Sequence, residues 1–314
     1  MDIMIIEKRK FLNNEIEKKL KTMSDGKIRP LFFKYKFNNK GKHNIYFLVE
    51  KEILDMIYMF YKCTYLKEIN LSPININNVE RFSHMFYDCS SLQKIDLPSF
   101  KTNKPISFSY MFYNCSTLKE INLSLFNISN VKDISHMFYF CSSFQRLNLS
   151  LFNTSKVTDM SFMFFECTKL EEIKLNFNTS NVKNMSSMFY GCNSLKEIIL
   201  SSFDTKNVMD ISDMFCNCSS INYLDLKSFN TSKAKTMAGI FTGCLSLKRI
   251  NLSNFKTNKV IDMSGMFRNC RSLEELDLLS FNTKNVKDMT NMFNGCSSLK
   301  YLNLTSFNTI SIEK

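Results

Sequence analysis

A cysteine returns every 26 residues along most of this 314-residue chain. The ten positions are Cys63, Cys89, Cys115, Cys141, Cys167, Cys192, Cys218, Cys244, Cys270 and Cys296, and only the step from Cys167 to Cys192 is 25 residues. Catalysis and metal binding do not require ten equally spaced thiols. A repeated structural unit does, because each copy puts the same residue in the same place. The spacing therefore predicts a repeat architecture.

Each cysteine belongs to a longer unit. From Cys141 the unit runs through Phe144, Leu147, Leu149, Phe152, Thr154, Val157, Met160, Met163 and Phe164 to Cys167. Its L-x-x-I-x-L pattern favours a short strand with one buried face. The spacing of its apolar residues from Val157 to Cys167 favours one face of a short helix, with Asn153 to Ser155 as turn and cap residues. We therefore expect strand, turn, short helix and turn.

A strand and a helix in one such unit cannot enclose a core, so neighbouring units must stack. Residues 53–314 are therefore expected to form an α/β solenoid of about ten 26-residue strand–turn–helix units, with a parallel sheet on one face. The one-residue deletion falls in the stretch 175–177, after a strand. Because loops absorb such changes, we expect the stack to continue through it.

Residues 1–52 do not fit the repeat and are expected to cap the solenoid. Residues 1–25 have a helical pattern, and residues 31–37 and 44–49 are strand-like and predict a β-hairpin. This segment is basic, and the six candidate contacts to an anionic partner are Lys27, Arg29, Lys34, Lys36, Lys40 and Lys42. The simpler interpretation is a solvated cap; the alternative is contact with a phosphate-bearing partner or an anionic membrane surface, with nucleic acid less favoured.

The unit F-N-T-x-x-V-x-D-M-S-x-M-F-x-x-C-x-S-L-x-x-I-x-L, complete from Phe152 through Cys167, resembles the BspA-like leucine-rich repeats of bacterial and protist surface proteins. The resemblance covers about residues 53–309. It implies a leucine-rich-repeat stack that acts in protein binding, adhesion or surface display. It supplies no catalytic residues.

The cysteines are interpreted as small buried apolar residues rather than as ligands or disulfide partners. Cys216 lies outside the column, and we expect its thiol to be exposed. His84 and His136 share one repeat position, before Met-Phe, which is expected to face solvent. No catalytic triad, phosphate loop or paired metal-ligand motif is present, so the chain is predicted to be non-enzymatic and to need no cofactor or metal.

The outward residues of the strands are the predicted binding surface. They are mostly charged or amide side chains in two columns, which suits cross-strand pairing. Ile199 and Tyr223 break this pattern, and exposed apolar and aromatic residues on a polar sheet favour partner binding. The candidate contacts to a protein partner are Lys174, Ile199, Tyr223, Asp225 and Arg249.

Two further expectations concern assembly and location. The last strand, within residues 301–304, is expected to be an open edge, which favours self-association as an alternative structural function. No run of 18 apolar residues exists, so a transmembrane segment is not expected. No signal peptide is visible either. The default location is cytoplasmic, and the family resemblance instead implies the cell surface.

Overall fold

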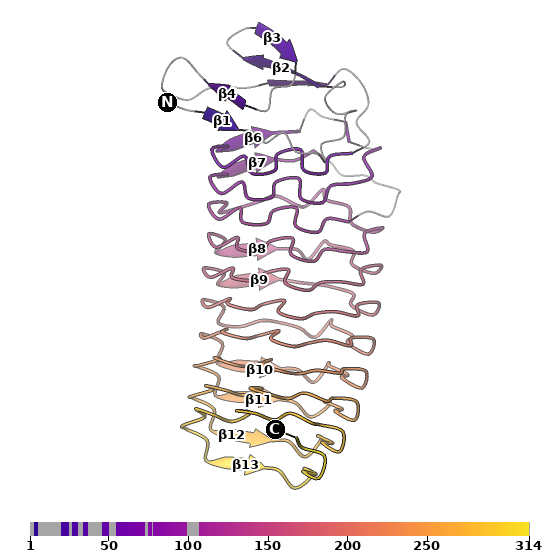
Figure 1. Ribbon diagram of the computed structural model, residues 1–314, viewed down its shortest axis with the longest axis vertical. Helices are drawn as coiled ribbons and strands as arrows, with labels where there is room; N and C mark the ends of the chain where they lie inside the picture. Colours follow the sequence, from indigo (N-terminus) through magenta and orange to yellow (C-terminus); the bar gives the residue numbers. More distant parts are fainter. Residues whose placement is uncertain are drawn as a thin grey trace.

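The computed structural model describes residues 55–72, 75–76, 78–98 and 107–313, together with the backbone of five strands between residues 3 and 49. Beyond the N-terminal segment the chain is a β-solenoid of about nine turns with a repeat of about 26 residues. Figure 1 shows these turns, called coils below, stacked along the long axis of the molecule. The prediction of a stacked repeat fold is confirmed.

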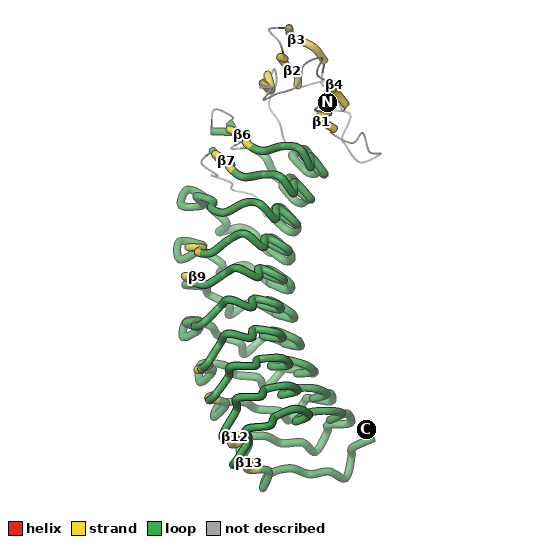
Figure 2. Tube along the Cα trace, turned by 90° about the vertical axis from the view of Figure 1, so that its left-hand side faces the viewer, coloured by secondary structure: helices red, strands yellow, loops and turns green. Residues whose placement is uncertain are grey.

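Short parallel strands line one side of the stack, which is called the strand face below (Figures 1 and 2). They pair as β6 (Glu68–Asn70) with β7 (Lys94–Asp96), β8 (Arg146–Asn148) with β9 (Glu172–Lys174), β10 (Tyr223–Asp225) with β11 (Arg249–Asn251), and β12 (Glu275–Asp277) with β13 (Tyr301–Asn303). In β6 to β9 the middle residue is buried and its two neighbours are exposed. This is the alternation that a strand with one buried face requires.

A second backbone ladder joins consecutive coils at another repeat position. It joins Asp133 to Asp159, Asp159 to Asn184 and Asn184 to Asp210 by parallel bridges. The step from Asp159 to Asn184 spans the 25-residue repeat, and the ladder passes through it without interruption. The expectation that a loop absorbs the deletion is therefore confirmed.

The helix expected in each unit is wrong, and the described residues contain no helix. The amides of Phe162 and Phe164 donate to the carbonyl oxygens of Ser186 and Met188 in the next coil, both at 2.9 Å. The amide of Phe165 instead donates to the carbonyl of Phe162, three residues earlier. An α-helix would direct all these amides within its own segment.

The segment is instead a series of tight turns. Phe162 and Glu166 both have φ of +56°, in the left-handed region, and equivalent residues of other coils share this conformation. Left-handed residues recur four positions apart and bend the chain at each occurrence, and this interval is close to the 3.6 residues of one α-helical turn. This explains why the apolar spacing of three, three, one and three residues suggested a helix.

The core is built from ladders of identical side chains. Phe86, Phe112 and Phe138 are fully buried and stack with ring centroids 5.6 Å apart and planes within 5° of parallel. This ladder extends from Phe60 to Phe293. Because each ring packs on the ring of the next coil, one repeated residue supplies core contacts along the whole stack.

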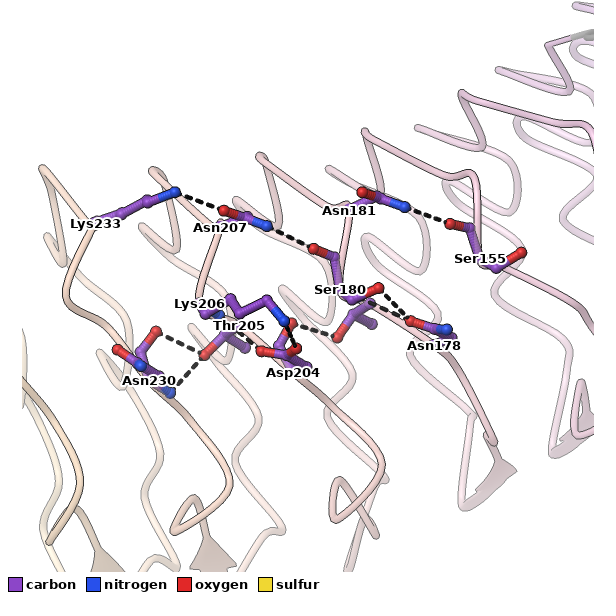
Figure 3. A network of polar contacts seen from close by, with 11 residues as sticks. Ser155, Asn178, Ser180, Asn181, Asp204, Thr205, Lys206, Asn207, Asn230 and Lys233 are labelled. Atoms are coloured by element: carbon purple, nitrogen blue, oxygen red, sulfur yellow. Dashed lines mark hydrogen bonds and ion pairs between the residues drawn. The ribbon is translucent and has the colours of Figure 1, made fainter.

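Polar side chains also bridge consecutive coils. The buried Thr205 hydroxyl donates to the carbonyl oxygen of Asn230 at 3.0 Å and accepts the amide of the same residue at 2.8 Å. At the surface, the side chain of Asn207 donates to the carbonyl of Ser180 at 2.7 Å, and Lys233 donates to the Asn207 side chain at 2.6 Å (Figure 3). The F-N-T segment therefore holds neighbouring coils together rather than capping a helix.

The described backbone of the N-terminal segment forms five strands, four of which are labelled beyond β6 in Figure 1. They are β1 (Ile3–Ile5), β2 (Leu20–Ser24), β3 (Lys27–Pro30), β4 (Lys34–Lys36) and β5 (Tyr46–Val49). Antiparallel pairing joins β1 to β4, and joins β2 to both β3 and β5.

This pairing corrects both predictions for the cap. Within the range expected to be a helix, residues 1–25, the two described stretches are the strands β1 and β2, and the rest of the range lies outside the described residues. The expected hairpin is wrong, because β4 and β5 belong to different sheets and the hairpin is β2–β3. Pairing with distant strands decided the structure, and local periodicity does not report such pairing.

Candidate functional site

Ile199 is the most exposed apolar residue of the strand face, with 76% of its surface accessible. It lies in the coil between β9 and β10, at the repeat position that Lys174 and Asp225 hold in the two neighbouring coils. Tyr223 in β10 is 48% exposed and pairs in register with Arg249 of β11. These five residues occupy three neighbouring strands and the coil between them, so we name them the Ile199 patch.

Two charged members of the Ile199 patch, Lys174 and Asp225, have polar partners. Lys174 lies 3.3 Å from the carboxylate of Glu172, and Lys227 lies 3.8 Å from that of Asp225. Asn251 donates to Asp225 at 3.2 Å. Because exposed ion pairs contribute little to stability, these contacts leave the charges available to a partner. Ile199 and Tyr223 remain the apolar centre of a polar rim, the arrangement of many protein interfaces.

The cysteine column is structural. Nine of its thiols donate to the carbonyl oxygen of a phenylalanine in the preceding coil at 3.0–3.3 Å, as Cys141 does to Phe112. Burial raises the pKa of the Cys141 thiol well above its usual range. These thiols therefore stay protonated, and all eleven cysteines of the chain are free.

The prediction that the Cys216 thiol is exposed is wrong, because Cys216 is buried. It occupies the position held by Tyr190 in the preceding coil, and its sulfur interacts with the Tyr190 hydroxyl. Burial and the nearby Asp213 carboxylate raise the pKa of Cys216 to about 12. A buried protonated thiol packs as a small apolar residue, so it gives no information about redox compartment.

The feature that the sequence analysis missed is a double stack of aromatic rings on the turns that replace the expected helix. One stack contains Tyr58, His84, Tyr110, His136 and Phe162, and its centroid distances are 4.2–4.7 Å. The other contains Tyr61, Tyr87, Tyr113, Tyr139, Phe165 and Tyr190, and its centroid distances are 4.3–4.8 Å. All are partly buried. The signal was present as aromatic residues recurring at two fixed repeat positions.

His84 and His136 belong to the first stack, and the expectation that they face solvent freely is wrong. Each is half-buried between two rings, and its Nδ1 atom is buried with no hydrogen-bond partner among the described residues. Burial lowers the pKa of His84 to about 4, against an opposing effect of the Asp133 carboxylate. Burial also lowers the pKa of His136. Both imidazoles are therefore neutral at pH 7.

Binding of an anionic partner by the basic N-terminal residues stays a prediction. Lys27 and Arg29 lie in β3, and Lys34 and Lys36 lie in β4. Lys40 and Lys42 lie outside the described residues.

Self-association through the last coil also stays a prediction. Its core residues Phe293, Leu299 and Phe307 are partly buried, whereas Phe267, Leu273 and Phe281 of the preceding coil are buried.

In the described part of the chain, no helix is long and apolar enough to cross a membrane. Over the same residues, no three histidine, cysteine or carboxylate side chains gather in a way that could hold a metal ion.

The fold is similar to those of two solved structures. One is the crystal structure of an internalin (InlF) from Listeria monocytogenes, at 15% identity and a TM-score of 0.31, covering 77% of this chain and 68% of that chain. The other is the crystal structure of a TLR13–ssRNA13 complex, at 16% identity and a TM-score of 0.31, covering 81% of this chain. This chain spans 42% of that second protein.

No curated protein matches this sequence. A family of repeat proteins does match the sequence, over most of its length. A family model matches in four overlapping stretches, residues 26–147, 108–223, 133–249 and 211–314, which together span the solenoid. The chain therefore belongs to the family described as Mycoplasma protein of unknown function, DUF285.

Proposed function

We propose that this protein is a non-enzymatic interaction scaffold that presents the Ile199 patch to a protein partner. The single observation that carries the proposal is the 76% exposure of Ile199 in the middle of a charged strand face. An exposed branched aliphatic side chain there adds nothing to the core. Binding of a partner over the Ile199 side chain is favourable, because it removes the apolar surface of this side chain from water.

The repeat architecture supports a scaffold. A solenoid offers a long, rigid surface on which neighbouring coils place side chains at a spacing of about 4.8 Å. The resemblance to BspA-like repeats supports adhesion or surface display as the setting of this interaction. The same resemblance supports the cell surface as the location of this interaction, and the cytoplasm is the alternative.

The test is partner recovery with a double variant of the Ile199 patch. Ile199→Asp and Tyr223→Lys together replace the apolar centre with charges, and recovery of cross-linked partners from native cells is expected to fall at least about tenfold. The matched control is Leu151→Asp with Tyr301→Lys, since Leu151 is 71% exposed and Tyr301 is 54% exposed outside the patch. Equal recovery of partners with the two double variants would show that the Ile199 patch is not the binding site.

A further inference from the structure

Lysines concentrate in one short stretch of three consecutive coils. Each stretch begins after a buried phenylalanine and ends before the second backbone ladder, and the three stretches are residues 230–235, 256–261 and 282–287. Together they contain six lysines, all exposed, and neither an acid nor an arginine. We call the three stretches the lysine ridge, and its lysines are Lys233, Lys235, Lys256, Lys259, Lys284 and Lys287.

This charge is local to the three coils. The equivalent stretches of the four preceding coils each have a formal charge of +1 or 0, and they are residues 127–132, 153–158, 178–183 and 204–209. In the last of these, Asp204 pairs with Lys206 at 2.8 Å. The fold therefore does not need lysine at these positions. Positive charge gathered on one part of a surface attracts anionic partners.

Hydrogen bonds near both ends hold the three stretches side by side. Near the start, the buried Thr231 hydroxyl donates to the carbonyl oxygen of Lys256 at 3.0 Å and accepts the amide of the same residue at 2.8 Å. At the end, the amide of Ile261 donates to the carbonyl of Lys235 at 3.0 Å, and the amide of Lys287 donates to the carbonyl of Ile261 at 2.8 Å. The lysines are therefore carried by a fixed backbone, with consecutive coils about 4.8 Å apart.

The lysine side chains have few partners within the protein. Lys233 donates to the side chain of Asn207 at 2.6 Å, along the edge of the coils drawn in Figure 3. Lys287 pairs with Glu313 at 2.9 Å. The other four ridge lysines make no ion pair and no side-chain hydrogen bond with the described residues. Lys233 and Lys259 hold the same position in consecutive coils, where like charges repel, and an anionic ligand relieves this repulsion.

Acids near the lysine ridge do not neutralise it. Asp262 and Asp288 follow the second and third stretches, and each accepts the backbone amide two residues later at 2.8 Å. After the first stretch the same position holds Thr236, which has no charge. Six lysines against these two aspartates and Glu313 leave the region with a formal charge of +3. The acids of β10 and β12 belong to the strand face.

Exposed apolar side chains alternate with lysines at one repeat position. Consecutive coils hold Lys183, Met209, Lys235, Ile261 and Lys287 there. Met209 is 40% exposed and Ile261 is 50% exposed. The residues that follow this position pair in register from coil to coil, so its side chains point to the same side. The result is a row in which basic and apolar side chains alternate.

This combination suits the surface of an anionic lipid bilayer. Lysine amines reach the lipid phosphates while their methylene stems and exposed aliphatic side chains enter the boundary of the acyl chains. Each lysine near such a surface strengthens binding by a factor of about five. Single-stranded nucleic acid fits less well, because its bases stack on aromatic or arginine side chains and the lysine ridge has neither.

We propose that the lysine ridge binds the surface of a membrane that contains anionic lipids, with Ile261 at the level of the headgroups. The contact is peripheral and does not depend on the Ile199 patch. It also differs from anion binding by the basic N-terminal segment, since β3 and β4 are drawn at the opposite end of the stack (Figure 1).

The test measures co-sedimentation of the full-length chain with vesicles of phosphatidylglycerol and phosphatidylcholine, and with vesicles of phosphatidylcholine alone. The chain is expected to sediment with the mixed vesicles only. The triple variant Lys235→Thr, Lys256→Asn, Lys259→Asn is expected to weaken this binding about a hundredfold. Threonine and asparagine occupy the same positions in other coils, so the variant is expected to fold.

The matched control is the triple variant Lys119→Gln, Lys196→Gln, Lys248→Gln. These lysines are exposed and share one repeat position outside the lysine ridge, where other coils hold Gln93 and Gln145. The two triple variants change the net charge equally. The control is expected to bind mixed vesicles within about fivefold of the parent.

A second pair of variants tests the apolar contribution at constant charge. Ile261→Thr is expected to weaken vesicle binding about fivefold, since it removes the aliphatic side chain that enters the interface. Thr158 holds the same repeat position in another coil. Leu151→Ser is the control, because Leu151 is 71% exposed outside the lysine ridge, and it is expected to leave binding unchanged.

Three results would overturn the proposal. They are absence of binding to mixed vesicles, an equal effect of the two triple variants, and loss of oligonucleotide binding rather than vesicle binding in the ridge variant. The last result would assign the lysine ridge to nucleic acid. Retained vesicle binding in the Ile199→Asp, Tyr223→Lys variant is expected and separates this site from the strand face.

Discussion

The Sγ atom of Cys141 lies 3.1 Å from the carbonyl oxygen of Phe112 in the preceding coil and donates its proton to it. The same contact recurs along the stack, so the cysteine column binds consecutive coils through their backbone. The Phe112 carbonyl also accepts the backbone amide of Cys115 at 3.1 Å, so the thiol supplies its second hydrogen bond. The 26-residue period of cysteine therefore places a small buried donor at the same point of each coil.

Replacing Cys141 with valine is expected to lower the free energy of unfolding by about 0.5–1.5 kcal/mol, because the Phe112 carbonyl loses one of its two hydrogen bonds and keeps the one from the Cys115 amide. Cys141→Ser keeps a donor and is expected to cost less than the valine variant. Urea denaturation of both variants measures the difference. Cys296→Val is the matched control, since its thiol makes the same contact with Phe267 in a half-buried position. A valine variant at Cys141 as stable as the parent would contradict the donor role.

The thiols are expected to resist alkylation in the native protein. Cys216, with a pKa raised to about 12, has little reactive thiolate at pH 8. Iodoacetamide treatment followed by peptide mass mapping is expected to modify Cys296 first, since it is the one cysteine that is only half-buried. All eleven are expected to react after unfolding in urea. Rapid native modification of Cys216 would show that its side chain is accessible.

Stability is expected to fall in mild acid because of the stacked histidines. The pKa of His84 is lowered from its ordinary value of 6.5 to about 4 in the folded state. Between these values the unfolded chain binds the proton and the folded chain does not. The free energy of unfolding therefore decreases as pH falls from 6.5 to 4, and this contribution stays constant below pH 4.

His84→Tyr with His136→Tyr is expected to reduce this pH dependence, measured by urea denaturation across the same range. Tyr58 and Tyr110 hold the same repeat position and backbone conformation, so tyrosine fits there. A parent and variant with the same slope between pH 4 and 6.5 would assign the acid sensitivity to carboxylates instead.

The sequence predicted what the repeat determines and missed what depends on contacts between coils. The buried cysteines, the alternation in β6 and β7 and the passage through the 25-residue step followed from the period alone. The helix prediction failed because left-handed residues such as Phe162 and Glu166 turn the chain at nearly helical intervals. The double aromatic stack was missed because Tyr87, Tyr113 and Tyr139 share one repeat position and therefore follow the period instead of breaking it.

Gly243 lies under the side chain of Asn217 from the preceding coil, and substituting it tests this contact. It has φ of +71°, and a Cβ atom added there would lie 2.2 Å from Oδ1 of Asn217 in the preceding coil. Gly243→Ala is therefore expected to lower the free energy of unfolding by about 2–4 kcal/mol, through backbone strain and the clash together. Gly265→Ala is the matched control. Its φ is +61°, but its nearest atom is Thr242 Oγ1 at 3.3 Å, so we expect only the strain, about 1 kcal/mol.

The double variant Asn217→Gly, Gly243→Ala separates the two effects. Asn217 is itself left-handed at φ +58°, so glycine is tolerated there. Removing its side chain eliminates the clash, and a double-mutant cycle is expected to give a favourable coupling of about 1–2 kcal/mol. The cycle is measured by urea denaturation of the parent, both single variants and the double variant. Zero coupling would mean that the Asn217 side chain does not lie over Gly243, and the loss in Gly243→Ala would then come from backbone strain alone.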